Sequence, residues 1–267
     1  MELLTIPFMR HVVIAGMLAA LGLAPLSVYV VLRRIVFVGA AVAEISSAGV
    51  ALAILFGVEP FAVALALTVV TFLAFSRIAE SPRLPLEALI GMLYAGGSAA
   101  AVLLIVKSPR GEGSVLNVLF GNILTVPLPL LWAMVVVFAI VLAIQYLAAK
   151  EFLIVAYDPD MARALGISVN LWNTVFYVTV GVAVALAIRA VGALLAFALL
   201  VAPGAVALCM VDRLGSAFTL ATVVGIAATV IGIFGSYWFD LPTGPTIVGL
   251  LAALFALSYV YAAMKPA

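Results

Sequence analysis

Long apolar runs alternate with short polar breaks along the whole chain. A transmembrane helix needs about 20 predominantly apolar residues, and nine runs come close to that length. The pattern predicts an all-α, polytopic bundle of about eight to nine transmembrane helices. The third run is short and the sixth and seventh are barely separated, so counts of eight and ten stay open. The runs cover residues 11–32, 36–57, 61–77, 85–106, 128–149, 172–189, 192–211, 216–235 and 245–264.

The composition agrees with a lipid environment. Of the 267 residues, 68% are hydrophobic and only 9% are charged, and the mean hydropathy is +1.41. A soluble chain has about 25% charged residues, which it needs to cover its surface. The net charge of +1 provides no basic patch for nucleic acid, and the one cysteine, Cys209, excludes an intrachain disulfide.

Basic residues in the short breaks orient the predicted spans, because Lys and Arg favour the cytoplasmic side. With the N-terminus outside and the C-terminus in the cytoplasm, eight basic residues lie inside and four outside. The inner set is Arg33, Arg34, Arg77, Arg83, Lys150, Arg163, Arg213 and Lys265. The outer set is Arg10, Lys107, Arg110 and Arg189.

Two breaks are longer than a simple turn. Residues 107–127 lie outside in this topology, and their apolar second half predicts a short helix against the membrane. Residues 150–171 lie inside and form the most polar stretch of the chain, so a partner is expected there. No repeat or low-complexity segment divides the sequence, and residues 1–267 are predicted to form a single transmembrane domain.

The inner break contains the signals of a short capped helix. Asp158 can cap its start, Pro159 fits the first turn, and Asp160 is favoured there by the helix dipole. Gly166 is a natural stop. An ordinary loop helix explains this pattern, and so does a docking element within residues 156–168.

The same segment resembles the coupling helix of ABC importer permeases, in its two spaced acidic residues, its Ala162 and its Leu165-Gly166-Ile167. The whole chain resembles the permeases of the zinc, manganese and iron importers, with matching motifs in order from about residue 8 to 260. These motifs are the double-arginine entry at 31–39 with the serines at 46–51, the Gly-Asn-Ile-Leu element at 119–124, the hairpin at 189–195 with 199–205, and the Asp-Leu-Pro ending at 240–245.

The resemblance implies a transport subunit in the inner or plasma membrane. A second permease copy would face the first across the pathway, two cytoplasmic ABC ATPases would dock on the coupling helix, and an extracytoplasmic protein would deliver the substrate. A divalent metal ion is then the substrate, ATP acts through the partner, and no cofactor is bound covalently. The expected ATPase contacts are Asp158, Asp160, Met161, Ala162, Leu165 and Gly166. The chain has no Gly-x-x-x-x-Gly-Lys-Ser/Thr loop, so it is not itself the ATPase.

Glu44 is the most informative single residue, because an ionisable group inside a span is costly and marks a pathway or a buried partner. Counted from Arg34 it lies about 15 Å into a hydrocarbon core of about 30 Å. A protonated or hydrogen-bonded structural glutamate between helices is the other interpretation.

Asp240 is the second candidate residue for the pathway. It ends the eighth span, and Pro242, Gly244 and Pro245 are expected to make the following backbone irregular. An ordinary interfacial loop is the alternative there.

The family pattern places an Asp and, four residues later, a His in the second span, whereas this chain has Ala40 and Glu44. The family also leads us to expect an acidic ligand near Gly235 and Ser236, and none is present. The one histidine, His11, is expected to be an interfacial side chain. Oxygen ligands from Glu44 and Asp240 favour manganese or iron over zinc. They also fit a substrate that is not a bare ion, or a transient pathway.

Other functions are less well supported. A secondary transporter is expected to show repeats or broken helix pairs. An intramembrane enzyme lacks its usual motifs here, such as His-Glu-x-x-His. An ABC permease for a metal chelate would also be driven by a partner ATPase, so a chelate remains the alternative substrate class.

Overall fold

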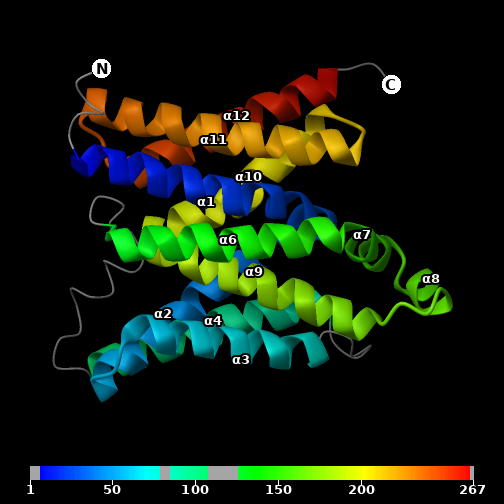
Figure 1. Ribbon diagram of the computed structural model, residues 1–267, viewed down its shortest axis with the longest axis horizontal. Helices are drawn as coiled ribbons and strands as arrows, with labels where there is room; N and C mark the ends of the chain where they lie inside the picture. The colour runs from blue at the N-terminus through cyan, green and yellow to red at the C-terminus, as the bar shows by residue number, and fades with distance from the viewer. Residues whose placement is uncertain (1–6, 79–84, 108–125, 265–267) are drawn as a thin grey trace. The chain divides into compact units, whose positions relative to one another are not determined.

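Helices account for all the regular structure in the part of the chain that the computed structural model describes, namely residues 7–78, 85–107 and 126–264. Within those residues, nine helices are long and apolar enough to cross a membrane, which confirms the polytopic bundle. They are α1 (Pro7–Leu32), α2 (Val38–Phe56), α3 (Pro60–Ile78), α4 (Leu86–Val106), α6 (Leu128–Leu147), α9 (Val169–Val191), α10 (Ala193–Met210), α11 (Leu214–Phe239) and α12 (Thr243–Met264). Two shorter helices, α7 (Ala149–Tyr157) and α8 (Pro159–Ala164), follow α6 (Figure 1).

The helix ends fall within a few residues of the sequence-based boundaries, with differences where the backbone turns sharply. Arg34 adopts a positive φ of 57°, and the chain turns over residues 33–37 before α2 begins at Val38. Gly192 alone separates α9 from α10 with a φ of 87°, a conformation that costs glycine little. The helix expected in the second half of 107–127, and the 119–124 motif, lie outside the described residues.

The chain forms two compact units that alternate in sequence. The first comprises residues 1–36, 120–138 and 187–267, and the second comprises residues 37–119 and 139–186. Helices α6 and α9 each contribute to both units.

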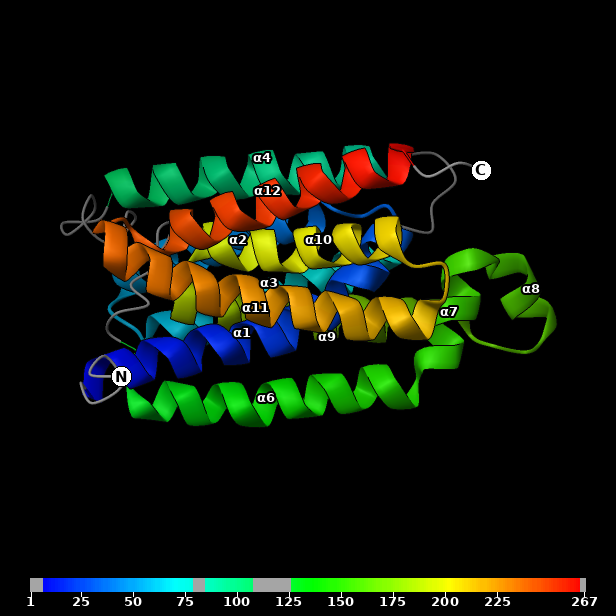
Figure 2. The ribbon, with the colours of Figure 1, turned by 90° about the horizontal axis from the view of Figure 1, so that it is seen from above.

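In the first unit, α1 packs on α10 and α11, and α12 packs on the same two helices (Figure 2). Small residues allow this close approach. A Cβ added to Gly204 would lie 2.5 Å from the backbone carbon of Ser27 and therefore has no room. Val28 packs with three alanines, Ala207, Ala217 and Ala221. Small side chains suit a membrane interior, where helices associate through close packing because lipid is as apolar as they are.

In the second unit, α2 packs on both α3 and α4. Gly49 on α2 meets the backbone of Ala64 on α3, where an added Cβ would approach Cα to 2.5 Å. Ring contacts join α3 to α9, since Tyr177 lies edge-on to Phe75 with ring centroids 5.0 Å apart. A buried hydrogen bond of 2.9 Å from Gln145 Nε2 to Thr179 Oγ1 joins α6 to α9.

Candidate functional site

A short helix that the sequence analysis missed precedes the candidate coupling segment. The chain breaks at Ala148 after α6 and then forms α7, which buries Phe152 and Val155. The ring of Phe152 packs edge-on against Trp172 and Phe176 of α9, with centroids 5.5 and 5.6 Å apart. We expected residues 150–171 to be a polar segment with one helix at 158–166. The spacing of Phe152 and Val155 was the available sign of α7, but the surrounding charges obscured it.

The structure confirms the predicted helix start and stop signals in residues 158–166. The Asp158 carboxylate caps α8 by accepting hydrogen bonds from the backbone N–H of Asp160, at 3.0 Å, and of Met161, at 2.9 Å. Pro159 is in the first turn, where its missing N–H costs nothing. Gly166 ends the helix with a φ of 78°. The helix is therefore defined by its own sequence.

One residue of α8 anchors it and the others face outward. Ala162 is fully buried against Val155 of α7 and Val169 of α9. Met161 and Leu165, in contrast, are 55% and 58% exposed. Asp160 is also exposed and forms an ion pair of 2.6 Å with Arg163. The helix thus presents apolar and charged side chains together on its outer surface.

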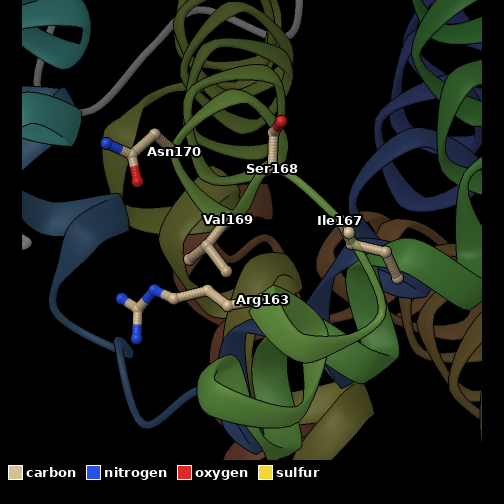
Figure 3. Close-up of a pocket in the computed structure, with 6 residues that line it drawn as sticks. Arg163, Ile167, Ser168, Val169 and Asn170 are labelled. Carbon is tan, nitrogen blue, oxygen red and sulfur yellow. The ribbon is translucent and has the colours of Figure 1, made fainter.

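An open hollow of about 420 Å³ lies where α8 leads into α9. Its lining is Arg163, Gly166, Ile167, Ser168, Val169 and Asn170, most of which Figure 3 shows around the cavity. Both Arg163 and Asn170 bring polar groups to its rim. The surface beside α8 therefore contains a hollow, and it carries apolar, polar and charged side chains together.

Glu44 lies in the second unit, six residues into α2, about 9 Å along a helix of about 28 Å. This is a third of the way along the helix, whereas the count from Arg34 gave half, because residues 33–37 turn instead of extending α2. The side chain is half-buried. Among the described residues, no hydrogen bond or ion pair to its carboxylate is found. Nearby polar groups on the same helix are engaged otherwise, since Ser47 Oγ donates to the carbonyl of Ala43 at 2.8 Å.

Asp240 lies in the first unit as the residue that ends α11. It has a φ of 53°, and its side chain is exposed. Ser236 holds the turn that follows, because its hydroxyl donates to the carbonyl of Leu241 at 2.5 Å and lies 3.0 Å from Thr243 Oγ1. From the sequence, Ser236 is notable only as a position where an expected acidic ligand is lacking, because its role in the turn depends on the folded backbone.

The expectation of irregular backbone through Pro245 is wrong. Helix α12 begins at Thr243, so Gly244 and Pro245 belong to its first turn. Proline is tolerated there because the first helical N–H groups have no partner within the helix. The irregular part is therefore limited to residues 240–242.

Within the residues that the structure describes, no three His, Cys, Asp or Glu side chains gather into a group that could hold a metal ion. Glu44 belongs to the second unit and Asp240 to the first. The half-buried His11 lies on α1, and the exposed Arg189 lies near the end of α9.

The comparison that decides the family covers nearly the whole chain. The model of the ABC 3 transport family matches residues 5–262. The chain belongs to this family. Relatives of this chain in the family include proteins named as transport system membrane proteins and as an import system permease protein. The chain is accordingly a permease subunit and not an enzyme, and ATP hydrolysis belongs to a partner subunit.

Three similar proteins illustrate the ABC 3 family. The manganese transport system membrane protein MntC of Halalkalibacterium halodurans is 29% identical over 97% of this chain and 89% of its own length. The chelated iron transport system membrane protein YfeD of Yersinia pestis is 26% identical over 97% of this chain and 87% of its own. PsaBC from Streptococcus pneumoniae, solved in complex with Fab, has a chain that is 25% identical and superposes with a TM-score of 0.83, covering 96% of this chain and 92% of that one.

Proposed function

We propose that this chain is the permease subunit of an ATP-driven importer of a divalent metal ion, with manganese or iron as the substrate. Two copies form the translocation pathway between them. Residues 1–267 act as one transmembrane domain in the plasma membrane, with the N-terminus outside and the C-terminus in the cytoplasm. Glu44 and Asp240 contribute oxygen ligands along the pathway.

The observation that carries this proposal is the carboxylate of Glu44. It lies on a helix of membrane-spanning length, and no described residue makes a hydrogen bond or ion pair with it. A structural glutamate between helices is expected to have such a partner, because an unpaired polar group away from water is costly. A carboxylate without a protein partner suits a cation that passes and does not stay.

The donor chemistry favours a hard ion. Carboxylate oxygens suit Mn²⁺ better than Zn²⁺, which more often takes nitrogen and sulfur ligands. The names of two relatives, one for manganese and one for chelated iron, agree with the same group of substrates.

The cytoplasmic ATPases dock on α8. Its outward face offers Met161 for apolar contact, and Leu165 directly after the helix adds to it, beside the ion pair of Asp160 and Arg163. The capped geometry keeps this face in one orientation. An extracytoplasmic binding protein delivers the ion on the opposite side of the membrane.

Uptake in a strain that lacks other metal importers tests the proposal. The permease is expressed with its ATPase and binding protein, and uptake of Mn²⁺, Fe²⁺, Zn²⁺, Co²⁺ and Ni²⁺ is measured. We expect uptake of Mn²⁺ or Fe²⁺ that stops when the ATPase is inactivated. Uptake that continues without the ATPase would indicate a secondary transporter. Uptake of a metal chelate but of no free ion would show that the substrate is a chelate and would contradict the proposal of a bare divalent ion.

A further inference from the structure

Helix α4 touches α2 at the position of Glu44. Most of the surface of α4 is exposed, and its buried residues include Ile90 and Ala101. Between these two lies the pair Gly96-Gly97. The sequence gives no reason to distinguish the two glycines, but the structure separates them clearly.

Gly97 lies directly on the α2 backbone. A Cβ added to it would lie 3.0 Å from the backbone nitrogen of Ile45, 3.1 Å from the carbonyl carbon of Glu44 and 3.2 Å from Glu44 Cβ. A Cβ added to Gly96 would meet nothing within 4 Å. Helices α2 and α4 pack against each other (Figure 1). Only Gly97, therefore, is required for the approach of α4 to α2.

The atoms that Gly97 meets cannot yield by rotating a side chain. Two of the three belong to the peptide between Glu44 and Ile45, and the third is the atom from which the Glu44 side chain leaves the helix. A methyl group at position 97 would therefore push the α2 backbone at Glu44 by a few tenths of an ångström. Protein interiors transmit such displacements because they are closely packed.

We propose that Gly97 is a positioning residue for the Glu44 carboxylate. This inference rests on the proposed pathway role of Glu44. By having no side chain, Gly97 lets the peptide after Glu44 lie against α4, which fixes where the carboxylate meets the passing ion. Small errors in the position of a functional group are costly, since a misplacement of 1 Å can reduce a rate by about 10²-fold.

A double-substitution cycle tests the inference in the complete importer reconstituted in proteoliposomes. ATP-driven Mn²⁺ uptake, divided by the amount of permease, is measured for Gly97→Ala, Glu44→Gln and the two together. Gly97→Ala is expected to lower uptake about threefold to tenfold, in line with a displacement well below 1 Å. Gly96→Ala is the matched control and keeps uptake at the level of the unchanged protein.

The two ways of failing are distinguishable. If Gly97 acts through the carboxylate, Gly97→Ala causes little further loss once Glu44→Gln is present. An equal loss in both backgrounds means that Gly97 only supports helix packing, and overturns the inference. If Glu44→Gln alone leaves uptake unchanged, the proposed pathway role fails, and with it the inference.

A second variant covers the case in which Gly97→Ala does not accumulate in the membrane. Ala101 is buried on α4 four residues further along, one turn away on the same helix face. Ala101→Val also enlarges this face. The same loss of uptake, absent in the Glu44→Gln background, supports the inference, and an undiminished loss in that background contradicts it.

Discussion

Removing the side-chain cap of α8 should uncouple the permease from its ATPase without unfolding it. In Asp158→Ala, the N–H groups of Asp160 and Met161 lose the acceptor that now lies 3.0 and 2.9 Å away. Loss of an N-cap costs about 1 kcal/mol, within a range of about 0.5–2 kcal/mol. Helix α8 has only six residues, and helices this short have little stability of their own.

The expected magnitude follows from that energy. A cost of about 1 kcal/mol lowers the ratio of ordered to frayed α8 about fivefold, because 1.4 kcal/mol corresponds to tenfold. The bundle itself is expected to keep its thermal stability, since the anchoring contact of α8 is made by Ala162 and not by the cap. The effect should therefore appear in coupling and not in folding.

The assay compares Asp158→Ala with Asp158→Asn in proteoliposomes that contain the ATPase and the binding protein. Asparagine keeps an acceptor oxygen and is as good a cap, while it removes the charge. We expect Mn²⁺ uptake per ATP hydrolysed to fall for Asp158→Ala, by at most about fivefold, and to stay nearly unchanged for Asp158→Asn. Equal losses in the two variants would show that the charge matters and the cap does not. Unchanged uptake in Asp158→Ala would refute the coupling role of an ordered α8.

Two further predictions concern the packing of the bundle. Gly204→Ala should prevent accumulation of folded permease, because its Cβ would lie 2.5 Å from the backbone carbon of Ser27, whereas Gly235→Ala has open space and should accumulate normally; quantitative membrane blotting decides between them. Phe152→Ala should lower the stability in detergent by about 3–5 kcal/mol, because a fully buried ring is removed. Thermal unfolding checks this, with the exposed Phe56→Ala as control, and equal stability of the two variants would contradict it.

The features that the sequence predicted well are those decided over short distances. The length of each apolar run determines a span, because lipid requires every backbone group to bond within its own helix. The cap at Asp158 and the stop at Gly166 also depend only on neighbouring residues. The break at Gly192 is also a local feature, and it could be anticipated because two apolar runs are separated there by very few residues of the sequence.

Features decided by distant residues could not be predicted in this way. Gly96 and Gly97 are equivalent in the sequence, and only the position of α2 shows which one is in contact. The role of Ser236 depends on the turn that brings Leu241 back to it. The start of α12 at Thr243 depends on the same turn. Of the two prolines that suggested irregular backbone, Pro245 therefore lies within the helix and Pro242 precedes it.

The carboxylate at position 44 is the most direct test of the whole account. Glu44→Gln is compared with Glu87→Gln, an exposed glutamate in the first turn of α4, in the ATP-driven uptake of Mn²⁺ by the reconstituted importer. We predict that Glu44→Gln lowers uptake at least about tenfold, which corresponds to a loss of about 1.4 kcal/mol of ion stabilisation, while Glu87→Gln transports normally. Equal, undiminished uptake by both variants would contradict the assignment of Glu44 to the ion pathway.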